Sequence, residues 1–295
     1  MDWNSRRVAA LVESALREDH TLADATSALT IEPGQEAQAE IVAKQEMVLA
    51  GLGLVPRVYE GYAALCEAAH GAVRRPRPVV VTSQGEVLDG VRLAAGQIVA
   101  VARGEARQLL ACERVILNFL QRLCGIATLT RRFVEAVAGT AARVLDTRKT
   151  LPGLRQLDKY AVTCGGGLNH RSDLSDGVLI KNNHIRLAGG VAAALERALS
   201  RRRPDQPIEI EVRTLEELSL ALAAGAERVL LDNMAPEEVR RAVALVAGRA
   251  TLEVSGGVTL ASVRAYAETG VQFISVGALT HSAPAVDLAM RIFAL

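Results

Sequence analysis

Cationic side chains gather in residues 146–184 of the chain, DTRKTLPGLRQLDKYAVTCGGGLNHRSDLSDGVLIKNNH. They lie just after apolar runs or inside a glycine-rich turn, and they are Arg148, Lys149, His170, Arg171 and Lys181. A solvated charged face would scatter both signs along a helix. Cations at the exits of expected strands instead favour a pocket that binds a polyanion.

Acidic residues and glycines follow the later apolar runs. Glu211 and Asp232 end two neighbouring expected strands, where carboxylates can hold Mg²⁺ through water or bind ribose hydroxyls. Glycines at the last two strand ends let backbone N–H groups approach a phosphate, and this group comprises Ser255, Gly256, Gly257 and Gly277. Each of these residues, taken alone, could simply cap a helix or form a turn. The full set favours a site for a phosphorylated sugar and an acidic co-substrate.

The elements that must position these residues alternate in type from residue 143 onward. Short β-branched runs are expected to be strands, at 144–145, 178–180, 208–212, 228–231, 251–254 and 273–276. Helical runs lie between the later ones, at 215–224, 236–246 and 260–268. This alternation predicts parallel β/α units, and their number favours a barrel, complete or incomplete. An open doubly wound sheet is the alternative, but no G-x-G-x-x-G follows a strand.

The residues before 143 predict an α+β arrangement. Helical periodicity covers 5–18 and 52–69, and strands are expected at 40–42, 47–49, 79–82 and 98–102. A long helical segment over 106–138 is expected to break at Gly125.

Composition limits the partners. The chain has 295 residues, half of them hydrophobic, and a net charge of +1, so neither nucleic acid nor an anionic membrane is expected. No apolar run is long enough to span a membrane, and the first residues predict an amphipathic helix rather than a signal peptide. Four cysteines without C-x-x-C spacing suggest reduced thiols in the cytoplasm. Cys164 could be a nucleophile, although a packed cysteine is the simpler reading.

The motifs DTRKT-x-PGLR, KYAV, GGG-x-NHR and LIK-x-NH together resemble the quinolinate phosphoribosyltransferases, also called carboxylating nicotinate-nucleotide pyrophosphorylases. The resemblance continues through LDN, SGG and ISVGALTHSAP, and upstream through ERVILNFLQRLCGIAT and DATS, so it covers nearly the whole chain.

This resemblance implies the fold of the type II phosphoribosyltransferases. An N-terminal α/β sandwich is expected over residues 1–118, completed by the tail 280–295. An incomplete (β/α) barrel with the active site is expected over 119–279. The resemblance also implies a homodimer with shared active sites, or a higher oligomer built from it.

The resemblance also assigns roles to residues of the motifs. Those implied to bind quinolinate are Arg114 (from the other subunit), Arg148, His170, Arg171 and Lys181. Those implied to bind phosphoribosyl pyrophosphate are Lys149, Glu211, Asp232, Ser255, Gly256, Gly257 and Gly277. The catalytic group would comprise Lys149, Lys181, Glu211 and Asp232, with the two carboxylates serving Mg²⁺ directly or through water. Arg213 departs from the pattern, which has an acidic residue there. Glu211 is preferred to Glu209 because Asp232 needs a partner on the neighbouring strand.

The implied activity is that of a pentosyltransferase in de novo NAD biosynthesis. Phosphoribosyl would pass from phosphoribosyl pyrophosphate to quinolinate with decarboxylation, giving nicotinate mononucleotide, pyrophosphate and CO₂. Three alternatives remain. The related pyrophosphorylase-like protein of molybdenum-transport clusters lacks the NHR and LIK-x-NH combination. The salvage enzymes use nicotinate without releasing CO₂. A catalytically silent binding subunit would not need the intact cations and carboxylates.

Overall fold

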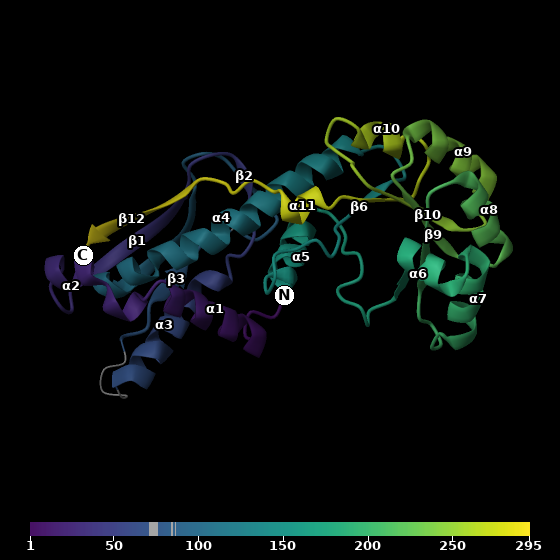
Figure 1. Ribbon diagram of the computed structural model, residues 1–295. Coiled ribbons are helices and arrows are strands. Elements are labelled where there is room, and N and C mark those ends of the chain that lie inside the picture. Colours follow the sequence, from purple (N-terminus) through teal and green to yellow (C-terminus); the bar gives the residue numbers. More distant parts are fainter. Residues whose placement is uncertain (71–75, 84, 86) are drawn as a thin grey trace. The chain divides into compact units, whose positions relative to one another are not determined.

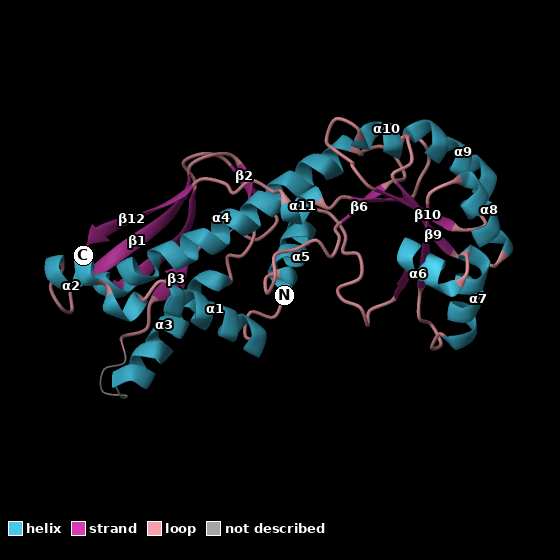
Figure 2. Cartoon of the chain, in the orientation of Figure 1, coloured by secondary structure: helices cyan, strands magenta, loops and turns pink. Residues whose placement is uncertain are grey.

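A computed structural model describes residues 1–70, 76–83, 85 and 87–295, and the chain forms two compact units (Figures 1 and 2). Unit 1 comprises Met1–Thr128 and Ala283–Leu295, and unit 2 comprises Leu129–Ser282. The boundary expected at residue 118 falls inside a single helix, α4 (Ala106–Ala136).

Unit 1 is built on a four-stranded antiparallel sheet with the strand order β12-β1-β5-β3. Its strands are β1 (Glu36–Ala43), β3 (Val80–Thr82), β5 (Ile98–Glu105) and β12 (Leu288–Ala294). A second, two-stranded sheet pairs β2 (Met47–Val48) with β4 (Arg92–Leu93). Strand β12 comes from the C-terminal tail and pairs along β1, so both ends of the chain contribute to this unit.

The helices of unit 1 other than α4 are α1 (Arg6–Glu18), the 3₁₀ helix η1 (Thr21–Ala23), α2 (Ala25–Thr30) and α3 (Leu54–His70). Helix α1 begins where the Ser5 hydroxyl accepts a hydrogen bond from the Val8 N–H, as an N-cap does. Its buried residues Val8, Val12 and Leu16 recur at helical spacing, and α1 packs against α3. A Cβ at Gly61 of α3 would lie only 2.9 Å from Val12 Cγ1, so this glycine lets the two helices approach closely.

The predicted break at Gly125 is wrong, because α4 is continuous from Ala106 to Ala136. A Cβ at Gly125 would lie 2.1 Å from the Pro284 carbonyl oxygen. Glycine is therefore present because the returning chain crosses the helix there. Its helix-propensity cost of about 1 kcal/mol is small within a helix of this length.

Unit 2 is built on a six-stranded parallel sheet with the order β6-β11-β10-β9-β8-β7. Its strands are β6 (Arg143–Leu145), β7 (Val178–Ile180), β8 (Ile208–Val212), β9 (Arg228–Asp232), β10 (Thr251–Ser255) and β11 (Phe273–Ser275). Across the described residues no ladder joins β6 to β7, so the barrel is incomplete. The expected α/β fold, with an N-terminal domain and an incomplete barrel, is confirmed.

Helices follow the strands of unit 2. In chain order these helices are α5 (Arg155–Cys164), α6 (Asn182–Ala188), α7 (Val191–Arg201), α8 (Leu215–Ala223), α9 (Pro236–Val246), α10 (Val263–Ala267) and α11 (Ala278–His281). Helices α6 and α7 were not expected from the sequence. His184 Nδ1 accepts a hydrogen bond from the Lys181 N–H at 2.9 Å, and this side-chain contact helps α6 begin.

The strands of unit 2 bury charged residues as well as apolar ones. Successive side chains of a strand point to opposite faces, so Glu209 and Glu211 of β8 share one face and Ile208, Ile210 and Val212 the other. On β10, the same alternation puts Glu253 and Ser255 on one face. This face of the sheet carries acidic and hydroxyl side chains, so the interior next to it is polar. A barrel core that served stability alone would be packed with apolar side chains.

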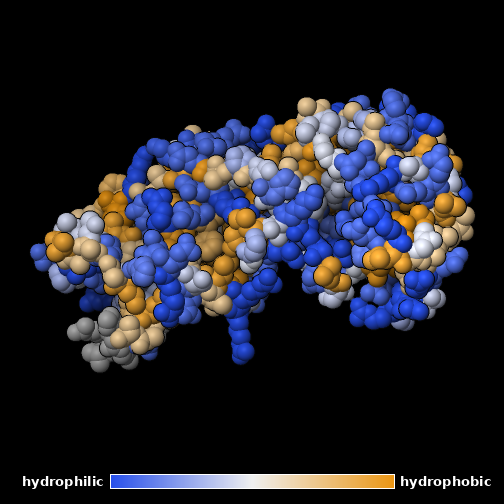
Figure 3. Space-filling view, viewed as in Figure 1, coloured by the Kyte–Doolittle hydropathy of each residue, from blue (hydrophilic) through white to orange (hydrophobic). Residues whose placement is uncertain are grey.

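Hydrophilic residues cover most of the surface visible in Figure 3, with apolar residues interspersed. None of the helices among the described residues combines the length and apolar character that crossing a bilayer requires.

Candidate active site

A pocket of about 460 Å³ opens at the carboxyl ends of the unit 2 strands. This volume suits a small-molecule ligand. The polar and glycine residues that line it are Thr147, Arg148, Lys149, His170, Arg171, Lys181, Glu211, Asp232, Asn233, Glu253, Ser255, Gly256, Gly257 and Ser275. Ligands of β/α barrels bind at this edge because the strands present side chains there without needing them for the core.

Two arginines of the pocket lie close enough to repel each other. Burial, followed by the nearby charge of Arg148, lowers the pKa of Arg171. Arg171 Nη1 donates to the Gly177 carbonyl oxygen at 3.2 Å. The Nε of Arg148 is buried and donates no hydrogen bond to any described residue. Two adjacent guanidinium groups with an unused buried donor form a site that an anion would stabilise.

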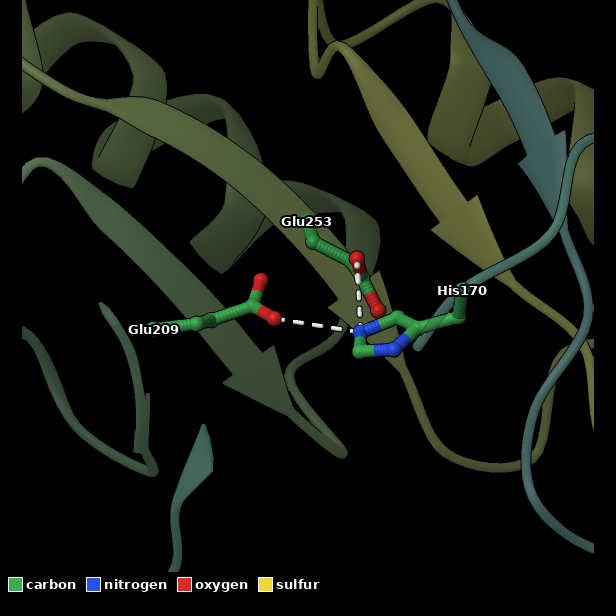
Figure 4. Close-up of side chains that lie close together, drawn as sticks. All are labelled: His170, Glu209 and Glu253. Atoms are coloured by element: carbon green, nitrogen blue, oxygen red, sulfur yellow. Dashed lines mark hydrogen bonds and ion pairs between the residues drawn. The ribbon is translucent and has the colours of Figure 1, made fainter. Parts of the chain in front are cut away.

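His170, which lines the pocket, points its ring towards two carboxylates, Glu209 and Glu253 (Figure 4). Its Nε2 is 3.1 Å from Glu209 Oε2 and 3.6 Å from Glu253 Oε2. Its Nδ1 accepts the Arg171 N–H at 2.7 Å, which favours the tautomer with the proton on Nε2. Burial alone would lower the pKa of His170, but the Glu209 hydrogen bond and the Glu253 charge raise it overall. Burial, then the charge of Glu209, raises the pKa of Glu253 to about 7.

The two predicted catalytic carboxylates each have a cationic partner. Lys181 Nζ lies 3.1 Å from Glu211 Oε2, and Arg213 Nε lies 3.1 Å from Asp232 Oδ2. The other Asp232 oxygen accepts the Asn233 amide at 2.9 Å. Arg213, at a position where an acidic residue was expected, is therefore an ion-pair partner of Asp232.

The loop after β10 needs glycine. Gly256 has φ +102°, and a Cβ there would lie 2.2 Å from Asn233 Oδ1 and 3.0 Å from the Asn233 backbone nitrogen. Gly257 also has a positive φ, of +62°. The loop after β10 and the end of β9 are thus in close contact, and the Asn233 N–H donates to the Ser255 carbonyl oxygen at 2.9 Å.

The structure gathers most of the predicted site residues in this pocket. Gly277 is not among its lining residues, although a Cβ there would lie 3.0 Å from Lys149 Cδ. Arg114 is exposed on the part of α4 that belongs to unit 1. The sequence analysis did not identify Glu253 as a site residue. Glu253 lies two residues before Ser255 on the same strand, so both side chains share one face of the sheet, and this alternation could have identified it.

An incomplete β/α barrel with cations, carboxylates and glycines at its strand ends is typical of an enzyme that binds phosphorylated small molecules. Residues 24–124 match the family described as "Quinolinate phosphoribosyl transferase, N-terminal domain", and residues 126–291 match its C-terminal domain. The chain therefore belongs to the quinolinate phosphoribosyltransferase family.

Similar proteins support this assignment. The "Probable nicotinate-nucleotide pyrophosphorylase [carboxylating]" of Bacillus subtilis is 41% identical over 258 residues, covering 88% of this chain and 84% of the relative. The "Nicotinate-nucleotide pyrophosphorylase [carboxylating]" of Mycobacterium leprae is 39% identical over 95% of each chain. The solved structure of the nicotinate-nucleotide pyrophosphorylase from Francisella tularensis has a TM-score of 0.86 and 37% identity, covering 97% of this chain and 96% of that one.

Proposed function

We propose that the chain transfers phosphoribosyl from phosphoribosyl pyrophosphate to quinolinate with decarboxylation, in de novo NAD biosynthesis. The products are nicotinate mononucleotide, pyrophosphate and CO₂. The observation that carries this proposal is the pair of neighbouring arginines, Arg148 and Arg171, in a pocket that Glu211 and Asp232 also line. The Mycobacterium leprae relative is named for this reaction, as a carboxylating nicotinate-nucleotide pyrophosphorylase.

Quinolinate, a pyridine dicarboxylate, binds at the cationic side of the pocket. Arg148 and Arg171 present forked donors, which match the planar geometry of a carboxylate. His170 and Lys181 complete this part of the site. An anion here relieves the repulsion between the guanidinium groups, so the pocket selects a doubly charged acceptor over a singly charged one.

Phosphoribosyl pyrophosphate binds at the strand ends that carry the carboxylates and glycines. Ser255, Gly256 and Gly257 offer the 5′-phosphate a hydroxyl and backbone donors, with Gly277 near Lys149. Lys149 and Lys181 bring positive charge to the groups shared by both substrates.

Glu211 and Asp232 fit a Mg²⁺ that arrives with the pyrophosphate. Both carboxylates line the pocket, and each already has a cationic partner, so contact through water fits them better than a closed protein cage. When bound, Mg²⁺ offsets the charge that accumulates on the departing pyrophosphate. Removal of divalent cations with EDTA should abolish turnover, and added Mg²⁺ should restore it.

The reaction itself depends mainly on orientation and electrostatics. The pocket holds the ring nitrogen of quinolinate in line with the anomeric carbon, and the N–C bond forms as the C–O bond to pyrophosphate breaks. Lys149 and Lys181 stabilise the charge on the leaving group. The quaternised pyridinium then accepts the electron pair left at C2 as CO₂ departs, and C2 takes up one proton.

The assembly is a homodimer in which Arg114 completes the quinolinate site of the partner subunit. The four cysteines form no disulfide among the described residues, which suits the reducing cytoplasm as the place of this activity.

Incubation with carboxyl-labelled quinolinate, phosphoribosyl pyrophosphate and Mg²⁺ tests the activity. Release of CO₂ and pyrophosphate in equal amounts is expected, with no product from nicotinate. Arg171→Ala should abolish release, whereas Arg186→Ala, exposed on α6, should not. Turnover of nicotinate alone would indicate a salvage enzyme, and no turnover of either acid would indicate a silent subunit.

A further inference from the structure

Helix α5 contacts both segments that carry the pocket cations. Arg155 and Lys159 are four residues apart on this helix, so they share one face of it. The two segments are residues 146–150, with Arg148 and Lys149, and residues 168–172, with His170 and Arg171. Neither α5 residue is among those that line the pocket.

Lys159 forms a buried connection between the two segments. Its side chain is 5% exposed, and its Nζ lies 2.5 Å from Asp146 Oδ1 and 2.9 Å from the His170 carbonyl oxygen. The same Asp146 oxygen accepts the His170 backbone N–H at 2.8 Å. Lys159 and Asp146 together therefore satisfy both backbone polar groups of His170.

Asn169 extends this connection. With its amide nitrogen facing the acceptors, it donates to Asp146 Oδ2 at 2.6 Å and to the Lys159 carbonyl oxygen at 2.9 Å. The Asp146 carboxylate then accepts three donors and is fully buried. Since Asp146 directly follows β6, it also fixes the point where the chain turns towards Arg148.

Arg155 connects the same two segments through a second set of contacts. Its Nε donates to Thr150 Oγ1 at 3.1 Å, its Nη1 to the Ser172 carbonyl oxygen at 3.2 Å, and its Nη2 to the Arg148 carbonyl oxygen at 3.4 Å. One guanidinium thus bonds to residues on both sides of the Arg148–Arg171 pair.

These contacts lie where few sheet hydrogen bonds hold the chain in place. Strand β6 is an edge of the incomplete barrel, and residues 168–172 join it through one isolated bridge, between Leu145 and Leu168. Beyond that bridge, side-chain donors take the place of a strand ladder. Two arginines that repel each other need such support, because each would otherwise move towards solvent.

We infer that Arg155 and Lys159 of α5, with Asp146, are positioning residues that hold the Arg148 and Arg171 segments at the spacing of a dicarboxylate. This inference rests on the proposed function, since it assigns the spacing to quinolinate. The residues act through the backbone of the segments and not by touching substrate.

Arg155→Met and the paired change Asp146→Leu with Lys159→Met test the inference. The paired change avoids leaving one buried charge alone, and such apolar replacements of buried pairs are often tolerated. We expect roughly 10- to 100-fold weaker quinolinate binding by calorimetry, the scale of one charge-assisted hydrogen bond to a carboxylate. Lys159→Arg, which keeps a cation with several donors, should retain more of the affinity than the paired change.

Leu157→Ala is the matched control for stability. Leu157 is buried on the same helix, so its truncation should lower the thermal midpoint while leaving quinolinate affinity unchanged. The inference is overturned if the folded Arg155→Met and paired variants bind quinolinate as wild type does. It is also overturned if Leu157→Ala weakens binding equally. Absence of quinolinate binding by the wild type would overturn the proposed function, and this inference with it.

Discussion

Arg148 and Arg171 are the residues that we propose bind the carboxylates of the acceptor. A lysine in place of either would keep the charge but lose the planar fork that fits a carboxylate. Burial, and after it the charge of Arg148, lowers the pKa of Arg171, and the Nε of Arg148 is buried without a partner among the described residues.

Arg171→Lys should therefore weaken quinolinate binding by roughly 2–3 kcal/mol, the scale of a charge-assisted hydrogen bond. Affinity for phosphoribosyl pyrophosphate should change little. Asp232→Asn should have the reverse effect, because we propose that its carboxylate serves the sugar and the metal. Calorimetric titration of each ligand into each variant measures both. Intact quinolinate affinity in Arg171→Lys, or equal loss of both ligands in a folded protein, would contradict the division between the cations and the carboxylates.

The raised pKa of the Glu253 carboxyl should make the free energy of unfolding depend on pH. Its pKa is raised from 4.5 to about 7, so between these values the folded protein holds a proton that the unfolded chain has lost. The free energy of unfolding should consequently fall by roughly 3 kcal/mol as the pH rises through this range. His170 acts in the same direction, because its stabilising contribution is also lost as the pH rises through its raised folded pKa.

Glu253→Gln stays neutral, so its thermal midpoint should decrease less than that of the wild type between about pH 5 and about pH 7.5. Scanning calorimetry across this range measures the difference. Glu268→Gln, at an exposed carboxylate paired with Arg264, should keep the wild-type profile. Parallel curves for Glu253→Gln and wild type would show that Glu253 does not carry the proton.

At the scale of elements, loops position the site through close backbone contact. Gly256→Ala would strain a φ of +102° and force Asn233 away, and Asp232 with it. We expect a loss of stability of roughly 1–3 kcal/mol and at least about tenfold weaker binding of phosphoribosyl pyrophosphate. Gly248→Ala has a comparable φ of +78° but no neighbour within 4 Å, so it should lose stability and keep the affinity. Equal affinities for the two variants would argue against a site at the β10 loop.

At the scale of the whole molecule, the proposed dimer predicts complementation between inactive chains. Arg114→Ala removes the residue given to the partner, and Lys149→Ala inactivates the barrel of its own chain. A mixed dimer then has one intact site, made by the Arg114→Ala barrel and the other chain's Arg114. Mixed dimers purified through two different tags should show about half of the wild-type activity. Inactive mixed dimers would rule out shared sites.

The sequence by itself determined the alternation of strands and helices in unit 2 and the residues at the strand ends. Both follow from local patterns, because β-branched runs and their boundaries are set by near neighbours in the chain. The cations, Glu211, Asp232 and the Ser255–Gly257 turn are identifiable from these patterns alone. The motif resemblance supplied the family and the role of Arg114, which no periodicity contains.

Only the tertiary structure decided the environments of these residues. Gly125 looked like a helix break because its Pro284 neighbour is distant in sequence, and α6 was missed because His184 stabilises its start through a side chain. The pairing of Arg213 with Asp232, the contacts of His170 with two glutamates, and the α5 contacts all join residues from separate elements. Such contacts depend on how strands order themselves in a sheet, and that order comes from the packing of the whole unit.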